Sequence, residues 1–139
     1  MSGKARIVSW ILQLVIAALL GMTMLAKFTS APEAVTLFSS LGVEPWGRYT
    51  VAVIELIGVL LILIPWTAPV GSVFAMGFGV GAMLTHILPT GVGIEFNDDG
   101  GTMFTMAIIL FVASTVTAVL RRKQIPVIGG MFGSEPESA

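Results

Sequence analysis

The sequence predicts an all-α integral membrane protein, a four-helix bundle with a short extra helix in the first outer loop. Of its 139 residues, 55% are hydrophobic and 11% are charged, whereas soluble domains average about 25% charged residues. The mean hydropathy of +0.96 points the same way. A helix needs roughly 20 apolar residues to cross the hydrocarbon core. Four stretches approach this length, at residues 7–27, 45–64, 68–88 and 102–120, and lipid requires their backbones to be helical.

The first stretch follows a basic N-terminus and has no small-residue cleavage site before its apolar run. We therefore expect a retained helix and not a removable signal peptide. In the first outer loop, Ser30 and Glu33 have the S-x-x-E spacing of a capping box, with Pro32 in the first turn. This pattern predicts a short helix over residues 32–41 that stops at Gly42 and lies over the mouth of the bundle or in the membrane interface.

The remaining connections also have clear signals. Pro65 and Pro69 flank a short turn between the second and third stretches. The second outer loop, residues 89–101, ends in the turn sequence NDDGG. Residues 124–139 are rich in Gly, Pro, Ser and Glu, a composition typical of disorder. The chain is thus predicted to contain one transmembrane domain, residues 1–123, and a disordered tail.

The distribution of basic residues predicts the orientation. Five of the seven Lys and Arg lie near the two ends of the chain: Lys4, Arg6, Arg121, Arg122 and Lys123. Basic residues flanking membrane spans favour the cytoplasmic side. With four spans, both termini and the tail are predicted to be cytoplasmic, and the protein is predicted to lie in the cytoplasmic (inner) membrane.

Composition argues against several functions. A net charge of −1 argues against nucleic-acid binding. The chain has no cysteine, which excludes thiol redox chemistry and cysteine-held iron–sulfur clusters in the chain itself. His86 is the only histidine, so two-histidine haem ligation within one chain is impossible. We find no nucleophile elbow, phosphate-binding loop or zinc signature, and expect no intrinsic cofactor.

The acidic residues of the second outer loop are a further candidate group. With His86, the side chains of Glu95, Asp98 and Asp99 include metal-binding residue types, but their loose spacing favours a solvated turn. We therefore predict no metal site, and keep Glu95, Asp98 and Asp99 as candidates for outer-loop polar contacts.

Glu55 is the residue that points to function, because it lies inside the apolar run of residues 48–64. A charge at the centre of a membrane helix costs roughly 2.5–3.5 kcal/mol on insertion scales, so such residues are usually paired or functional. Lys27 and His86 lie near the outer ends of the first and third stretches. We hypothesise that Lys27, Glu55 and His86 converge in a polar pocket open to the outer side, where they bind a ligand or exchange protons.

Each of these residues also has a structural interpretation. Lys27 is long enough to extend to the lipid headgroups, and a histidine is often a packing residue. Glu55 and Lys27 together are consistent with a structural lock as well as with a ligand site. On the third stretch, a face of small residues that includes Gly79, and a second pair formed by Gly77 and Gly81, favour close helix packing.

Several short stretches together resemble the DoxX-like family of small four-helix bacterial membrane proteins, over residues 11–122. They are GMTMLAK at 21–27, LGV at 41–43, ELIG at 55–58, LIP at 63–65, GAMLTH at 81–86 and DGG at 99–101. The resemblance implies a four-helix bundle in the cytoplasmic membrane. For some members it implies a link to quinone-coupled thiosulfate oxidation or to oxidative-stress complexes. The family's polar residues correspond to Lys27, Glu55 and His86.

Two functions follow as expectations. The first is a subunit without a redox centre that binds a small lipophilic molecule, with a quinone as the candidate, and works with an oxidoreductase partner. As an enzyme it would be at most an accessory subunit. The alternative is a membrane assembly or scaffolding protein in which Lys27, Glu55 and His86 form a structural polar cluster. A homodimer is a candidate assembly; transport would depend on one, because the chain has no inverted repeat.

Overall fold

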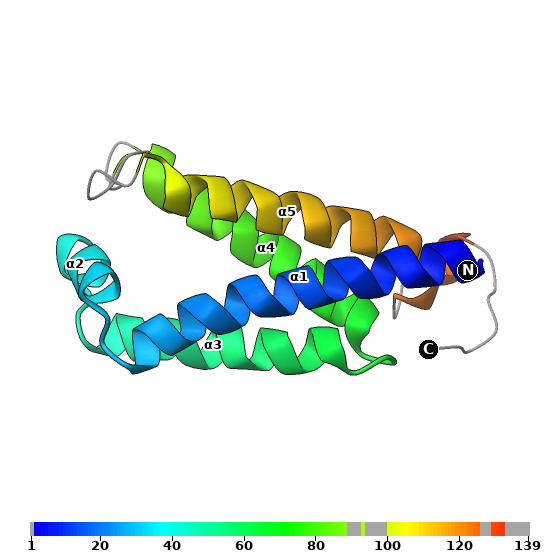
Figure 1. Cartoon of the computed structure of the whole chain (residues 1–139), viewed down its shortest axis with the longest axis horizontal. Coiled ribbons are helices and arrows are strands. Elements are labelled where there is room, and N and C mark those ends of the chain that lie inside the picture. The colour runs from blue at the N-terminus through cyan, green and yellow to red at the C-terminus, as the bar shows by residue number, and fades with distance from the viewer. Residues whose placement is uncertain (1, 89–92, 94–99, 126–128, 133–139) are drawn as a thin grey trace.

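The computed structural model, described over residues 2–88, 93, 100–125 and 129–132, confirms the predicted all-α fold (Figure 1). Four helices are long and apolar enough to cross a membrane: α1 (Gly3–Phe28), α3 (Trp46–Leu63), α4 (Ala68–Ile87) and α5 (Thr102–Leu120). The short helix α2 (Pro32–Ser40) lies between α1 and α3, as predicted for the first loop. The protein is therefore a multi-pass membrane protein.

The helix ends lie close to the predicted positions, except at the start of α1. This helix begins at Gly3 because Ser2 caps it, with Ser2 Oγ accepting a hydrogen bond from the Ala5 backbone N–H at 3.1 Å. Beyond α5, short 3-10 helices cover Arg122–Gln124 and Gly129–Phe132. The rest of the predicted disordered tail, residues 126–128 and 133–139, lies outside the described residues, and disorder stays a prediction.

The start of α2 differs from the predicted capping box. Ser30 has a φ of 58°, in the left-handed region, and the N-cap position is occupied by Ala31 without a side-chain hydrogen bond. Ser30 belongs to the turn that ends α1, so its hydroxyl does not cap α2, and the capping-box prediction is wrong. The predicted stop at Gly42 is confirmed, since Gly42 has a φ of 75° that glycine adopts without strain.

The four long helices form two pairs, α1 with α3 and α4 with α5. The pairs meet at the end of the bundle that holds the N-terminus and separate towards α2 (Figure 1). Gly71 explains how closely α4 approaches α3, because a Cβ atom there would lie 2.7 Å from the backbone nitrogen of Ile62. Gly79 allows a similar approach to α5, with a Cβ atom 3.1 Å from the Cα of Phe111.

Small-residue packing is thus confirmed for Gly79, but the prediction is wrong for Gly77 and Gly81. A Cβ atom at either of these two positions would meet nothing within 4 Å, so neither glycine packs closely against another helix in the described part of the chain. The reason is geometric. The pairs have already separated where Gly77 and Gly81 lie, so α4 has no close neighbour on that face.

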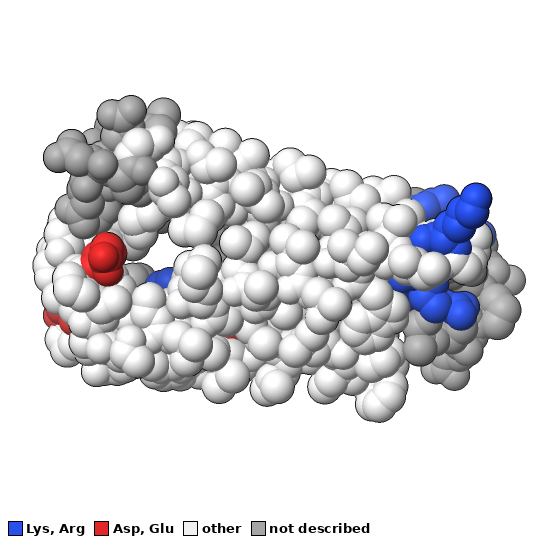
Figure 2. Space-filling model, viewed as in Figure 1, with Lys and Arg blue, Asp and Glu red and all other residues white. Residues whose placement is uncertain are grey.

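An apolar layer fills the middle of the bundle. It contains one or two buried residues from each long helix: Ile16, Leu20, Ile62, Ala75, Leu110 and Ala113. Most Lys and Arg side chains lie at the end of the bundle that holds the N-terminus (Figure 2). The space on the opposite side of the apolar layer, towards α2, contains the candidate site. The cytoplasmic position of the basic end stays a prediction.

Candidate functional site

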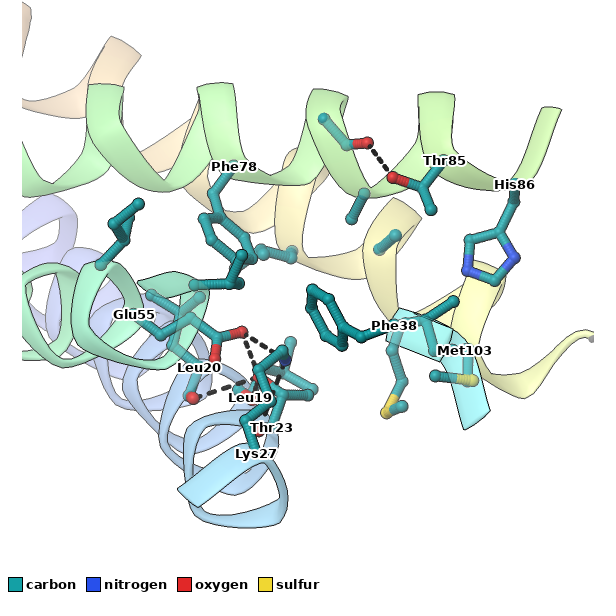
Figure 3. A pocket seen from close by; sticks show the side chains of 18 of the residues that line it. Leu19, Leu20, Thr23, Lys27, Phe38, Glu55, Phe78, Thr85, His86 and Met103 are labelled. Atoms are coloured by element: carbon teal, nitrogen blue, oxygen red, sulfur yellow. Dashed lines mark hydrogen bonds and ion pairs between the residues drawn. The ribbon is translucent and has the colours of Figure 1, made fainter. Parts of the chain in front are cut away.

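Glu55 is fully buried at the middle of α3, and one of its oxygens is held by α1. Oε1 lies 3.0 Å from Lys27 Nζ and 2.7 Å from Thr23 Oγ1, both of which can donate to it (Figure 3). Oε2 is also buried, and it has no hydrogen-bond partner among the described residues. An ammonium and a hydroxyl on one carboxylate oxygen stabilise the ionised form of Glu55.

Lys27 lies in the last turn of α1, and its side chain is 12% exposed. The Lys27 side chain points towards Glu55 and forms an ion pair with it (Figure 3). The alternative interpretation, in which Lys27 extends to the lipid headgroups, is not what the structure shows. Its ammonium lies 3.4 Å from the Thr23 carbonyl oxygen as well. An ammonium has three hydrogens, and these contacts use at most two of them.

Arg48 supports the Lys27 end of the site, a role that our sequence analysis missed. The Arg48 side chain is 4% exposed, and its Nε donates to Glu44 Oε1 at 2.8 Å. Its Nη1 donates to the Lys27 backbone carbonyl. Arg48 thereby ties the end of α1 to the start of α3. The spacing of four residues between Glu44 and Arg48 is the signal that indicates such a pair.

His86 is buried at the end of α4, with an exposed fraction of 6%. Its Nδ1 lies 2.7 Å from the Gly93 carbonyl oxygen. A carbonyl oxygen only accepts, so Nδ1 carries a hydrogen, and Nε2 of the neutral ring is an acceptor. The ring also packs edge-on against Phe104, at 5.9 Å between centroids. Among the described contacts, no hydrogen bond joins His86 to Lys27 or Glu55.

A cavity of about 490 Å³ brings these groups together between the four long helices and α2. Lys27, Glu55 and His86 all line it, from α1, α3 and α4 (Figure 3). Figure 2 shows a hollow in the surface at the α2 end. Thr23 and Thr85 are the other polar lining residues; the apolar ones are Leu19, Leu20, Leu37, Phe38, Leu41, Val51, Ile54, Gly77, Phe78, Gly81, Ala82, Met103, Met106, Ala107 and Leu110.

The cavity is therefore mainly apolar, whereas we had expected a polar pocket. Its character comes from the apolar faces of α2 and α5, which contribute Phe38 and Met103 among others. The polar groups lie at separate points on its wall. This placement brings the three predicted residues to one cavity, while their role in binding a ligand stays a prediction.

The three acidic loop residues Glu95, Asp98 and Asp99 lie outside the described residues, so their outer-loop contacts also stay a prediction. Across residues 2–88, 93, 100–125 and 129–132, no three His, Cys, Asp or Glu side chains come together as metal ligands do.

A second polar cluster lies on the other side of the apolar layer. Arg121 is fully buried, and its Nε donates to Ser9 Oγ at 2.8 Å and to Gln13 Oε1 at 3.0 Å. Gln13 in turn donates to the Ile62 carbonyl at 2.9 Å. Burial, and then the charge of Arg6, lowers the pKa of Arg121. Sequence analysis had assigned Arg121 only to the basic end, because periodicity does not show that Gln13 and Ser9 face it.

Comparison with known proteins agrees with this architecture. The model of the DoxX-like family matches residues 11–97, which include most of α1, all of α2, α3 and α4, and the residues Lys27, Glu55 and His86. No curated protein and no solved structure matches the chain. Since the matched region covers more than half of the sequence, the protein belongs to the DoxX-like family.

Proposed function

We propose that this protein binds a small lipophilic molecule, with a quinone as the candidate, in the cavity between its helices. It would act as a subunit without a redox centre that works with an oxidoreductase partner. The observation that carries the proposal is the Lys27–Glu55 ion pair on the wall of a mainly apolar cavity of about 490 Å³. Ligand pockets have this character: about 300–1,000 Å³, mainly apolar, with a few polar groups that orient the ligand.

The polar groups fit the head group of a quinone. Lys27 Nζ has a hydrogen beyond those used by Glu55 and Thr23, and a quinone carbonyl is a suitable acceptor. Nε2 of neutral His86 is an acceptor, which suits the hydroxyl of the reduced form. The apolar remainder of the lining suits the ring. A carbonyl-bearing ring is therefore a better match than a fully apolar molecule.

Reduction of a quinone to its quinol adds two electrons and two protons. The electrons would come from the partner protein, because the chain lacks cysteine and has a single histidine. The residues of the chain would position the head group and exchange protons with it. Oriented donors and acceptors in a site of low polarity act more strongly than they do in water.

The alternative is an assembly or scaffolding protein, and one observation favours it. Lys27 and Thr23 both contact Glu55 Oε1 and so join α1 to α3, as a structural lock would. This function predicts that Glu55→Gln is tolerated and that a specific membrane-protein partner copurifies without a ligand in the bundle.

The two functions are separated by measuring binding of a labelled benzoquinone with a decyl tail to the purified protein in nanodiscs. For the ligand-binding function we expect saturable binding that Lys27→Met weakens by about tenfold or more, since a hydrogen bond from a charged group is lost. Gly21→Ala, at an α1 position with open space and away from the cavity, should leave binding unchanged. No saturable binding to the unmodified protein would reject the quinone proposal.

A further inference from the structure

We infer that the apolar tail of the bound ligand leaves the cavity sideways, between α3 and α4 over Gly77 and Gly81, and lies in the bilayer. This inference rests on the proposed function and concerns how the ligand is held. It makes the opening between α3 and α4 the part of the site that selects long-tailed ligands.

The position of the two glycines is the first support. Gly77 and Gly81 are one turn apart on α4, both line the cavity, and both are exposed, as are Val80 and Leu84 beside them on the helix. A Cβ atom at either would meet nothing within 4 Å. At these two positions α4 therefore has no side chain between the cavity and the surface of the bundle.

The facing side of the opening belongs to α3. Val51 and Ile54 line the cavity, and Ile54 is 37% exposed. Ile54 directly precedes the buried Glu55, so on this helix an exposed apolar side chain and the buried carboxylate line the same cavity. The opening is therefore lined by apolar residues on both α3 and α4, as a path for a hydrocarbon tail should be.

The packing of α3 against α4 shows where the opening begins. Gly71 contacts the backbone of α3 near Ile62, and a Cβ atom at Gly58 would lie 3.0 Å from the ring of Phe74. Beyond these contacts α4 diverges from α3 towards α2 (Figure 1). The helices α3 and α4 are thus closely packed near Gly71 and Gly58, and they are separated beside the Lys27–Glu55 pair.

The volume of the cavity is a further argument that the ligand tail extends out of it. A cavity of about 490 Å³ lies in the range of pockets that bury a drug-sized head group, so a much longer hydrocarbon tail extends beyond it. A tail that stays in lipid has no desolvation cost, because lipid tails are as apolar as the cavity wall. A second helix seated on Gly77 and Gly81 is the competing occupant, but it would cover the cavity that these glycines line.

The test compares two probes, a methoxy-substituted benzoquinone without a tail and the same head group with a decyl tail. Each is titrated against the protein in nanodiscs, and affinities are expressed per mole fraction in the bilayer. Gly81→Leu places an apolar side chain at the opening, at a position where an added Cβ atom would meet nothing within 4 Å. Gly21→Leu is the matched control, because Gly21 has equally open space on α1 and does not line the cavity.

We expect both probes to bind the unmodified protein, and Gly81→Leu to weaken the decyl probe by about tenfold while changing the tail-less probe much less. Gly21→Leu should change neither. Binding of the tail-less probe alone would show a closed cavity and overturn the inference while leaving the proposed function intact. Equal weakening of both probes, or of neither, would also overturn it.

Two further results are separate from these. Failure of both probes to bind the unmodified protein would reject the proposed function itself. The other result is that Gly81→Leu converts a dimer to a monomer, measured by light scattering, while the ratio of the affinities for the two probes stays the same. That result would assign the Gly77 and Gly81 face of α4 to contact with a second copy of the chain, and it would overturn the inference.

Discussion

Lys27 Nζ lies 3.0 Å from Glu55 Oε1, so the last turn of α1 is joined to the middle of α3 by an ion pair with little access to solvent. The same contact places a cation and an anion on the wall of the cavity. The contribution of the ion pair to stability can be measured separately from its contribution to ligand binding. Removing Lys27 alone and removing both Lys27 and Glu55 are expected to affect stability differently.

Removing Lys27 alone should be more harmful than removing both partners. Lys27→Met leaves a buried carboxylate without its cation, which costs about 3–5 kcal/mol. The double variant Lys27→Met with Glu55→Gln removes both charges and should recover a large part of that loss. The measurement is unfolding in mixed detergent micelles by circular dichroism. A double variant as unstable as the sum of the two single variants would show that the pair is not coupled.

The glycines of α4 should divide into two classes. Gly71→Ala places a methyl group 2.7 Å from the Ile62 backbone nitrogen and should destabilise the bundle by about 1–3 kcal/mol. Gly77→Ala enters open space and should be neutral or stabilising by up to about 1 kcal/mol, because alanine favours the helix. Thermal unfolding of both variants in one detergent is the comparison. A larger loss for Gly77→Ala would contradict the observed separation of α3 and α4.

In the second polar cluster, Gln13 should matter more than Arg121. Gln13→Leu leaves the Ile62 carbonyl without its donor and Arg121 Nε with Ser9 alone, which costs about 1–3 kcal/mol. Arg121→Met leaves Ser9 bonded to Gln13 at 2.7 Å and Gln13 bonded to Ile62, and it removes a buried charge. We expect the Arg121 variant to be the more stable of the two on thermal unfolding. The reverse order would show that Arg121 anchors the cluster.

The predicted orientation can be tested directly because the chain has no cysteine. Gly3→Cys and Ser39→Cys place single thiols at exposed positions at opposite ends of the bundle. A membrane-impermeant maleimide should label Ser39→Cys in right-side-out vesicles and Gly3→Cys only in inverted ones. Labelling in the opposite sense would place both termini outside, contrary to the distribution of basic residues.

The four spans and α2 could be predicted because they follow from local properties. Apolar length gives the spans, and Pro32 and Gly42 give the limits of α2. The prediction that Ser30 caps α2 was wrong because serine is also suited to the turn that ends α1. The sequence alone does not show to which of these two adjacent elements Ser30 belongs. The earlier start of α1 could also have been predicted, because the Ser2 cap is a local sequence signal that our prediction missed.

The site was predictable only in part. Glu55 stood out because a charge in an apolar run is costly, and Lys27 was the nearest available cation. The roles of Arg48 and Gly77 depend on where helices separate, which is a property of tertiary packing. Gly77 and Gly79 show this best: they lie two residues apart and have the same side chain, yet one faces open space and the other contacts α5.

The apolar layer of Ile16, Leu20, Ile62, Ala75, Leu110 and Ala113 separates the cavity from the cluster around Arg121. Leu20 and Leu110 belong both to this layer and to the cavity wall. Every side chain of this layer is apolar. Under the proposed function, protons exchanged with a ligand at Glu55 would therefore enter and leave from the α2 end of the bundle and not through the cluster around Arg121.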